Sequence, residues 1–156
     1  MDVSMPMDNA EFQALVAKQR TELGNFSEMI VAAELFRLGF SASKPLNGTN
    51  KGYDLIVDTG TALYRIQVKT ITGSGQIAIG YTKRFLEWAT GSYKSIEVGK
   101  YTPESFDFAA GVDRKTREVF LIPISDLDLS KAFFSLGSKR DIYALSHLSF
   151  QKDGSE

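Results

Sequence analysis

Two neighbouring stretches of alternating apolar and polar residues most constrain what this chain of 156 residues can fold into. Residues 53–58 (YDLIVD) and 62–71 (ALYRIQVKTI) have the period of two that is typical of β-strands. The turn between them is short and contains Thr59 and Gly60, which predicts an antiparallel hairpin. The chain is therefore expected to contain a sheet with at least one antiparallel pair.

This hairpin is expected to bring polar side chains together. Because side chains alternate across a strand, Arg65, Gln67 and Lys69 share one face of the second strand. Asp54 lies about as far from the turn as Gln67 does, so we expect the two to face each other across the pair. Aspartate and glutamine oxygens suit a hard divalent cation such as Mg²⁺, and a lysine beside them can stabilise charge that develops on a phosphate.

A helix is expected before the hairpin, at residues 26–38 (FSEMIVAAELFRL), with Gly39 ending it. Gly24 is expected to end or kink an earlier helical segment. Residues 82–102 show no clear period. The remaining elements that we expect are strands at 40–44, 76–81, 106–112 and 118–124 and a short helix at 126–136. This order predicts an α/β or α+β fold with one mixed sheet.

One carboxylate on the predicted helix needs an explanation. Glu28 falls in line with the apolar positions of the helix, which are expected to be buried. Glu34 lies three residues before Arg37, so a solvated ion pair accounts for it. Glu28 has no basic residue three or four positions later. It either caps the helix N-terminus or reaches a metal ion or a lysine.

Composition excludes several kinds of site. The chain has no cysteine, which excludes disulfides, thiolate zinc sites and a cysteine nucleophile. Its single histidine, His147, excludes sites that need two histidines and argues against a Ser-His-Asp triad. No apolar run approaches the ~20 residues of a membrane span, and the acidic N-terminus does not resemble a signal peptide, so we expect a cytoplasmic protein.

The order Glu28, Asp54, Gln67-Val68-Lys69 resembles the PD-(D/E)XK nuclease superfamily. The surrounding segments GNFSEMIVAAELFRLGF, NKGYDLIVD and YRIQVKT are most similar to the members associated with group I introns. The later segment FDFAAGVDRKTREVFLIPISDL resembles a strand pair of the same group. The resemblance covers about residues 19–128.

The resemblance implies a restriction-endonuclease-like α/β fold, with an αβββαβ core whose mixed central sheet is flanked by helices. Residues 1–156 would form a single nuclease domain. The C-terminal segment 129–156 would then serve for oligomerisation or packing. It contains Phe133 and Phe134 side by side, so one of them is expected outside the core of the monomer. A nuclease that cuts both strands needs two active sites, which leads us to expect a homo-oligomer, either a dimer or a tetramer.

The resemblance also implies roles for the site residues. Asp54, the Gln67 side chain and the Val68 carbonyl would hold Mg²⁺, for which Mn²⁺ can substitute. Glu28 would be a direct or water-mediated ligand, and Lys69 would position or activate the attacking water. Gln67 departs from the usual Asp or Glu of the superfamily. It keeps a carbonyl oxygen but removes a negative charge, so metal affinity should be lower.

Double-stranded DNA is the expected partner, and no membrane is expected. The net charge is only −1, but residues 41–100 carry eight basic and four acidic side chains. The polar loop before Asp54 is one candidate for DNA contact, with an ordinary solvated loop as the alternative. For the charged turn of Arg114, Lys115 and Arg117 we favour simple solvation. The residues that we expect to bind DNA are Asn47, Thr49, Asn50 and Lys51 in the loop, followed by Lys83 and Arg84.

Several functions remain open on the sequence alone. The first is a Mg²⁺-dependent DNA endonuclease that makes site-specific double-strand cuts of the homing type. The second is a structure-specific nuclease resembling the Holliday-junction resolvases. The third is a DNA-binding relative that has lost catalysis, and the fourth is an α/β domain in which the motif is accidental.

Overall fold

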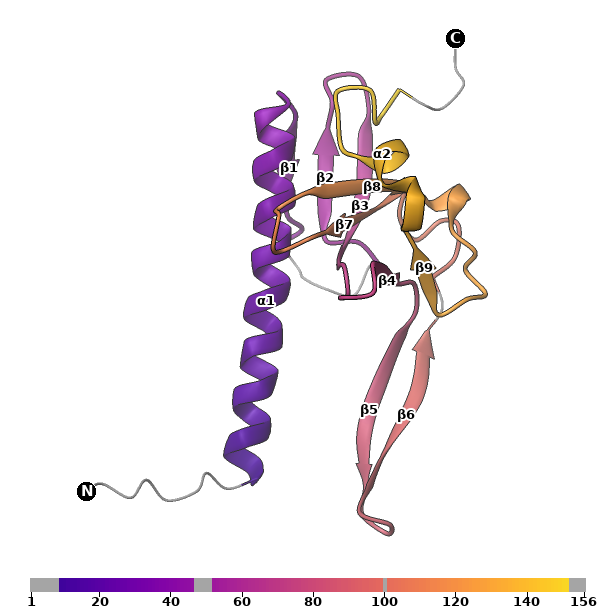
Figure 1. The fold of residues 1–156 in the computed structure, drawn as a ribbon. Helices are drawn as coiled ribbons and strands as arrows, with labels where there is room; N and C mark the ends of the chain where they lie inside the picture. Colours follow the sequence, from indigo (N-terminus) through magenta and orange to yellow (C-terminus); the bar gives the residue numbers. More distant parts are fainter. Residues whose placement is uncertain (1–8, 47–51, 100, 152–156) are drawn as a thin grey trace, which may run out of the picture.

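The computed structural model describes residues 9–46, 52–99 and 101–151. A long helix, α1 (Asn9–Arg37), packs its C-terminal half against a five-stranded sheet (Figure 1). The strand order in the sheet is β1-β2-β3-β7-β8. The bounds are β1 (Ser41–Ser43), β2 (Leu55–Asp58), β3 (Leu63–Thr70), β7 (Phe108–Val112) and β8 (Val119–Pro123).

The sheet is mixed, as expected from the sequence. β1, β2 and β3 pair antiparallel, β3 pairs parallel with β7, and β7 pairs antiparallel with β8. Parallel neighbours need a long crossover connection, which here runs from the end of β3 to the start of β7. The crossover contains β4 (Gln76–Ala78), β5 (Tyr81–Glu87) and β6 (Ser92–Gly99).

The helix that the αβββαβ order places in this crossover is absent from its described residues, so that part of the prediction is wrong. β5 and β6 instead form an antiparallel hairpin that extends away from the sheet (Figure 1). The sequences YTKRFLE and SYKSIEVG are rich in aromatic, β-branched and alternating residues, which favour strands over a helix.

Helix α1 is longer than expected. It continues through Gly24, so the prediction that Gly24 ends or kinks a helix is wrong. A glycine inside a helix costs only about 1 kcal/mol relative to alanine, which the neighbouring turns can offset. Gly39 does terminate the helix, with a φ of 87°. The N–H of Phe40 donates to the Leu35 carbonyl at 3.0 Å and that of Gly39 to Phe36 at 2.9 Å, the pattern of a Schellman motif.

The helix expected at 126–136 is also wrong. The segment forms a 3₁₀ turn, η1 (Ile124–Asp126), and then β9 (Phe133–Ser135), which pairs antiparallel with β4. Asp128 Oδ1 accepts hydrogen bonds from both the N–H and the hydroxyl of Ser130. Such local bonds compete with helical backbone bonds, which explains why a helical pattern here does not produce a helix.

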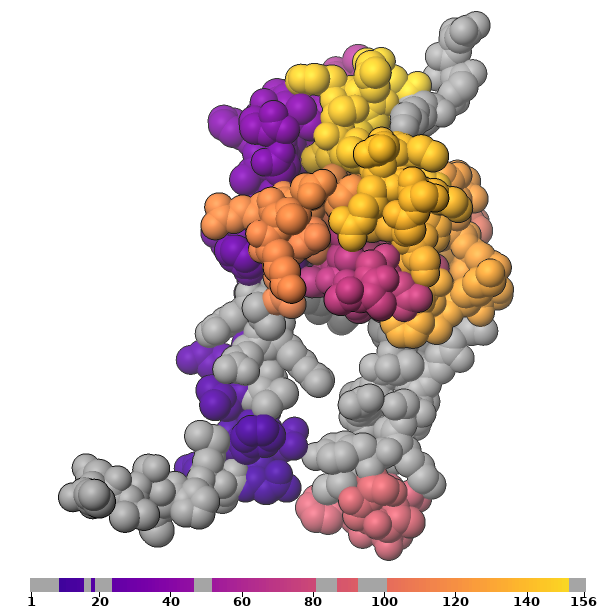
Figure 2. Space-filling model, viewed as in Figure 1, coloured from indigo at the N-terminus to yellow at the C-terminus, as the bar shows by residue number. Residues whose placement is uncertain are grey.

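The C-terminal segment packs on the domain. After β9 it forms η2 (Gly137–Lys139) and α2 (Arg140–Tyr143), and the Leu145 N–H then donates to the Val119 carbonyl of β8 at 2.9 Å. In the space-filling view this segment, in yellow, lies directly against the orange strands (Figure 2). Phe134 packs against buried residues, whereas its neighbour Phe133 is 51% exposed.

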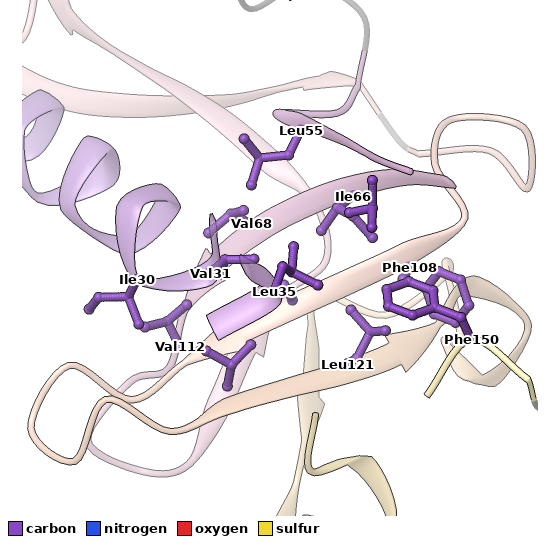
Figure 3. Close-up of a cluster of buried hydrophobic side chains, with 13 residues drawn as sticks. Ile30, Val31, Leu35, Leu55, Ile66, Val68, Phe108, Val112, Leu121 and Phe150 are labelled. Atoms are coloured by element: carbon purple, nitrogen blue, oxygen red, sulfur yellow. The ribbon is translucent and has the colours of Figure 1, made fainter. Parts of the chain in front are cut away.

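Both faces of the sheet are covered. On one face, Val31 and Leu35 of α1 point towards Val68, Val112 and Leu121 of the strands (Figure 3). The second face carries another apolar cluster, contributed by the crossover, β8 and the C-terminal elements: Ile77, Ile79, Tyr101, Phe106, Ala109, Phe120, Ile122, Leu127, Leu136 and Tyr143. The polar face of β3 therefore meets this second cluster instead of open solvent. No helix among the described residues has the length and apolar character that crossing a membrane requires.

Candidate active site

Asp54 lies where β2 begins and faces Gln67 of β3, as the sequence predicted. The last registered pair is Leu55 with Ile66, and the Asp54 N–H donates to the Ile66 carbonyl at 2.8 Å. The Asp54 carboxylate then continues the ladder in place of a backbone carbonyl. Its Oδ2 accepts the N–H of Val68 and the Nε2 of Gln67, both at 2.8 Å.

This arrangement leaves three oxygen atoms available. Both hydrogen bonds from described residues reach Oδ2 of Asp54, so its Oδ1 has no donor among them. Gln67 uses its nitrogen for Asp54, which frees its carbonyl oxygen. The Val68 carbonyl points to the same side of β3 as that of Ile66, into the space beyond the start of β2, and contacts only Gln67 Nε2 at 3.4 Å among the described residues.

Gln67 is buried, at 9% exposed, and does not project into solvent. Burying an amide is costly unless it is hydrogen-bonded, and the bond to Asp54 meets that requirement. A carboxylate at position 67 would instead lie beside Asp54 with like charge. Gln67, which stands where the superfamily usually has Asp or Glu, therefore orients the Asp54 carboxylate and avoids repulsion between two carboxylates.

The surroundings change the acidity of Asp54 and Lys69 in opposite directions. Burial raises the pKa of Asp54, and the Glu28 carboxylate raises it further, while the Val68 N–H, Lys69 and Lys44 lower it. Burial lowers the pKa of the Lys69 ammonium, and Asp54 opposes that shift. The ammonium also lies 5.2 Å from the ring centre of Tyr101. Both residues are thus held in environments that disfavour their charged forms.

Glu28 is brought to this site by α1. The buried Ser27 hydroxyl lies 2.8 Å from that of Thr70, which fixes the helix against the end of β3. Because α1 begins at Asn9, Glu28 cannot be an N-terminal cap, and that alternative is wrong. Its carboxylate instead pairs with Lys44 at 2.6 Å, with the Glu28 side chain 18% exposed. The separate expectation of a Glu34–Arg37 ion pair is confirmed at 2.9 Å.

Lys44 is a site residue that the sequence analysis missed. It follows β1, sixteen positions after Glu28, so no helical or strand period connects the two. Only the packing of β1 against β2 brings the loop after β1 to the start of β2. The one indication in the sequence was that Glu28 lacked a local partner.

The residues expected to bind DNA are only partly described. Asn47, Thr49, Asn50 and Lys51 lie outside the described residues. Lys83 and Arg84 belong to strand β5, but their side chains are outside the described set.

A second polar feature lies beyond the C-terminal ends of β3 and β7. It is an open hollow of about 380 Å³ lined by Ile71, Thr72, Gly73, Asp113, Arg114, Lys115 and Arg140. Arg140 stacks over Phe120 at 5.4 Å and lies 3.8 Å from the Asp113 carboxylate. Arg114 and Lys115 of the charged turn that we expected to be simply solvated thus share the hollow with a third cation, Arg140 of α2, which sequence spacing did not reveal.

Comparisons with known proteins give the family and the fold of the chain. A family model described as PD-(D/E)XK endonuclease matches residues 17–139. The chain belongs to this family. The PD-(D/E)XK assignment covers Glu28, Asp54, Gln67, Val68 and Lys69, and it identifies the chain as a phosphodiester hydrolase by family.

Among solved structures, the chain is similar to a bacterial homing endonuclease, I-Ssp6803I. The TM-score is 0.53 and the sequence identity 18%, over 85% of this chain and 79% of the other. At this identity the likeness shows the fold, an α/β architecture with a mixed central sheet. No curated protein matched the sequence.

The donor set of the site fits an oxygen-preferring divalent ion. Within residues 9–46, 52–99 and 101–151, no three His, Cys, Asp or Glu side chains group closely enough to hold a metal. The donors here are mixed: the Asp54 carboxylate, the Gln67 amide oxygen and the Val68 carbonyl, with Glu28 as a nearby second carboxylate. Hard oxygen atoms of these kinds are the ligands of Mg²⁺ and Mn²⁺.

We predict that Asp54→Asn stabilises the protein in EDTA, and increasingly so as the pH rises. The folded state holds the pKa of Asp54 above its ordinary value of 3.8, so ionisation of this residue on raising the pH reduces stability. Asparagine does not ionise. The melting temperature of the variant minus that of the wild type should therefore grow as the pH rises above 3.8, and level off once Asp54 is ionised in the folded state.

The control for this prediction is Asp141→Asn, at an exposed aspartate of α2. Its melting temperature should follow the wild type across the pH range, because substitutions at exposed positions have small effects. A difference for Asp54→Asn that shrinks with rising pH would contradict the burial argument.

Proposed function

We propose that the chain is a Mg²⁺-dependent DNA endonuclease that cuts both strands at a specific site, in the manner of homing enzymes. The observation that carries this proposal is the joint contact of Val68 and Gln67 with the Asp54 carboxylate at the start of β2. It supports a metal site made of hard oxygen atoms with a half-buried lysine, Lys69, alongside. The likeness in fold to a bacterial homing endonuclease favours the homing role.

In this mechanism Asp54, the Val68 carbonyl and, once its amide group is turned over, the Gln67 carbonyl oxygen would hold the ion, with Glu28 as a further direct or water-mediated ligand. A bound Mg²⁺ supplies Lewis acidity and lowers the pKa of a coordinated water. Lys69 would contact the attacking water. Because burial lowers its pKa, a larger fraction of its side chain is neutral, which lets it accept the proton of that water.

Lys44 compensates the acidic residues before the ion arrives. Glu28 and Asp54 interact unfavourably, and the Lys44 ammonium offsets this by pairing with Glu28. A divalent ion would supply more positive charge at the same place. Lys44 would then be released towards solvent, where its side chain is already 55% exposed.

The basic hollow is suited to a phosphate of the DNA backbone. Arg114, Lys115 and Arg140 supply three cations against one carboxylate, in a chain whose net charge is −1. Arg140 is oriented by Phe120 and Asp113, so its guanidinium is partly fixed before binding. The lining of the hollow starts at Ile71, directly after β3, so it lies close to the proposed site of cleavage along the strand.

We predict that Asp54→Ala and Lys69→Ala each reduce Mg²⁺-dependent cleavage by at least about 100-fold. DNA affinity in EDTA should change by less than about threefold, because neither residue is a main phosphate contact. The matched control is Lys131→Ala, at an exposed lysine 4.0 Å from Asp128, which should cleave like the wild type.

The substrate set decides between the alternatives. A plasmid library with random inserts, a four-way junction and a plain linear duplex are incubated with and without Mg²⁺, and the cut ends are sequenced. One recurrent sequence at the cut ends supports the homing proposal, whereas selective cutting of the junction supports the resolvase-like alternative. Undiminished cutting by either variant contradicts the site assignment, and no cutting of any substrate indicates a non-catalytic relative.

A separate prediction concerns the hollow. Removing a phosphate contact lowers affinity on all sequences and reduces the dependence on salt by about one unit of log K against log salt. Arg114→Ala and Lys115→Ala should each show this in EDTA, measured by fluorescence anisotropy from low to moderate salt. Lys131→Ala again serves as the control. An unchanged salt slope for both variants would assign DNA binding to another surface.

A further inference from the structure

The β5–β6 hairpin begins and ends beside the candidate active site. Its first strand follows β4, which is joined to the end of β3 by a turn in which the Thr72 N–H donates to the Gln76 carbonyl at 2.9 Å. Its second strand ends just before Tyr101, whose ring centre lies 5.2 Å from the Lys69 ammonium. Because β2 begins opposite the middle of β3, Asp54, which precedes it, lies towards this same end of β3. A substrate that reaches Lys69 therefore comes close to the base of the hairpin.

From this base the hairpin extends away from the sheet (Figure 1). Strand β5 has seven residues and, at the rise of a β-strand, spans about 23 Å. The described residues at the tip of the hairpin, 87–92, belong to neither apolar cluster of the domain. A two-stranded ribbon fits the major groove of B-DNA, which is about 12 Å wide. The hairpin therefore has the dimensions of an element that lies in a DNA groove.

The turn at the tip is held by hydrogen bonds that do not involve the side chain of Trp88. The Gly91 N–H donates to the Glu87 carbonyl at 2.9 Å, and Gly91 has the left-handed φ of 65° that this turn requires. The Thr90 hydroxyl donates to the Glu87 carboxylate at 3.0 Å and lies 2.7 Å from the Ser92 hydroxyl. The Trp88 side chain is 89% exposed. The turn thus presents the indole ring to solvent from a defined backbone.

Folding of the domain does not explain a tryptophan at this position. Turns favour Gly, Asn, Asp and Ser, whose backbones or short polar side chains suit the tight path of the chain. Tryptophan contributes to stability by burying its large ring, and Trp88 leaves that ring in water. Exposed tryptophans are typical of surfaces that become covered on binding. The tip of the hairpin is therefore expected to contact a partner.

Charge and position favour DNA as this partner. Residues 81–100, which include the whole hairpin, carry four basic and two acidic side chains, whereas the net charge of the chain is −1. A basic ribbon attracts the phosphate backbone, and this ribbon starts beside the lysine of a nuclease site. Every base has an aromatic face on which a tryptophan ring can stack, whatever the sequence.

We propose that Trp88 stacks on DNA bases at a step that the tip of the β5–β6 hairpin partly opens. Apolar side chains insert between base pairs in this way in proteins that kink DNA. The proposal rests on the proposed function, because it takes DNA as the substrate. It does not depend on catalysis, and the length of the hairpin places the contact at a distance from the bond that is cut.

The first experiment uses Trp88 as its own probe, since it is the single tryptophan of the chain. Tryptophan fluorescence of the full chain is measured in EDTA as a plain linear duplex is added, and anisotropy of a labelled copy of that duplex measures binding. Stacking predicts that bound DNA lowers the emission and shields the ring from acrylamide, a neutral quencher that DNA does not repel. Unchanged emission at saturation overturns the proposal. Shielding that grows with protein concentration in the absence of DNA also overturns it, because a second copy then covers the ring.

The second experiment changes the ring. Trp88→Ala should weaken binding of the same duplex in EDTA by about tenfold, and Trp88→Phe, which keeps an aromatic ring, by less than about threefold. The dependence of affinity on salt should stay as in the wild type, because no phosphate contact is lost. The control is Phe36→Ala, at a phenylalanine of α1 that is 81% exposed, which should bind like the wild type. Wild-type affinity of Trp88→Ala, or a reduced salt slope, overturns the proposal.

Cleavage keeps this proposal and the proposed function apart. Mg²⁺-dependent cutting by a protein whose Trp88 emission does not respond to bound DNA overturns the stacking contact and leaves the proposed function standing. Loss of emission on binding, with no cutting of any substrate, overturns the proposed function and leaves the contact standing. A protein that binds no duplex overturns both.

Discussion

The structure of the site depends on the Asp54 carboxylate, which takes the place of a backbone carbonyl where β2 begins. Where β2 begins, the Asp54 side chain accepts the Val68 N–H that a backbone carbonyl would otherwise accept. The same oxygen accepts the Gln67 amide, which fixes the direction of that side chain. The Val68 carbonyl beside it loses its neighbour in the sheet and faces the site. A single break in β-pairing thus leaves the Asp54 carboxylate and the Val68 carbonyl beside the Gln67 amide group, whose nitrogen contacts both.

Apolar clusters cover both faces of the sheet, and this burial changes the pKa values of the charged residues at the site. The face of β3 that carries Gln67 and Lys69 lies under the aromatic and aliphatic cluster that includes Tyr101 and Phe106. Burial there raises the pKa of Asp54 and lowers the pKa of Lys69, so each charge is unfavourable until an opposite charge arrives. In the protein without an ion, the buried charges of Asp54 and Lys69 therefore reduce the free energy of unfolding, at the site where function requires charge. Lys44 relieves part of this cost through Glu28.

The sequence predicted the local parts of this arrangement well. The hairpin register that opposes Asp54 and Gln67 follows from strand alternation and a short turn, and Gly39 ends α1 because a left-handed residue is needed there. Features set by tertiary packing were not predictable in this way. The hairpin that replaces a crossover helix, the continuous path of α1 through Gly24 and the contact of Lys44 with Glu28 all join segments that no local period connects.

The central claim is that a divalent ion binds at the break in the ladder beside Asp54. Crystals grown with Mn²⁺ and measured at its absorption edge test this directly, because anomalous scattering locates the metal independently of the protein atoms. The account predicts one strong peak about 2.0–2.3 Å from Asp54 Oδ1 and from the Val68 carbonyl, with the Gln67 carbonyl oxygen turned towards it. A peak elsewhere, or a Gln67 nitrogen occupying that position with no metal bound, would contradict it.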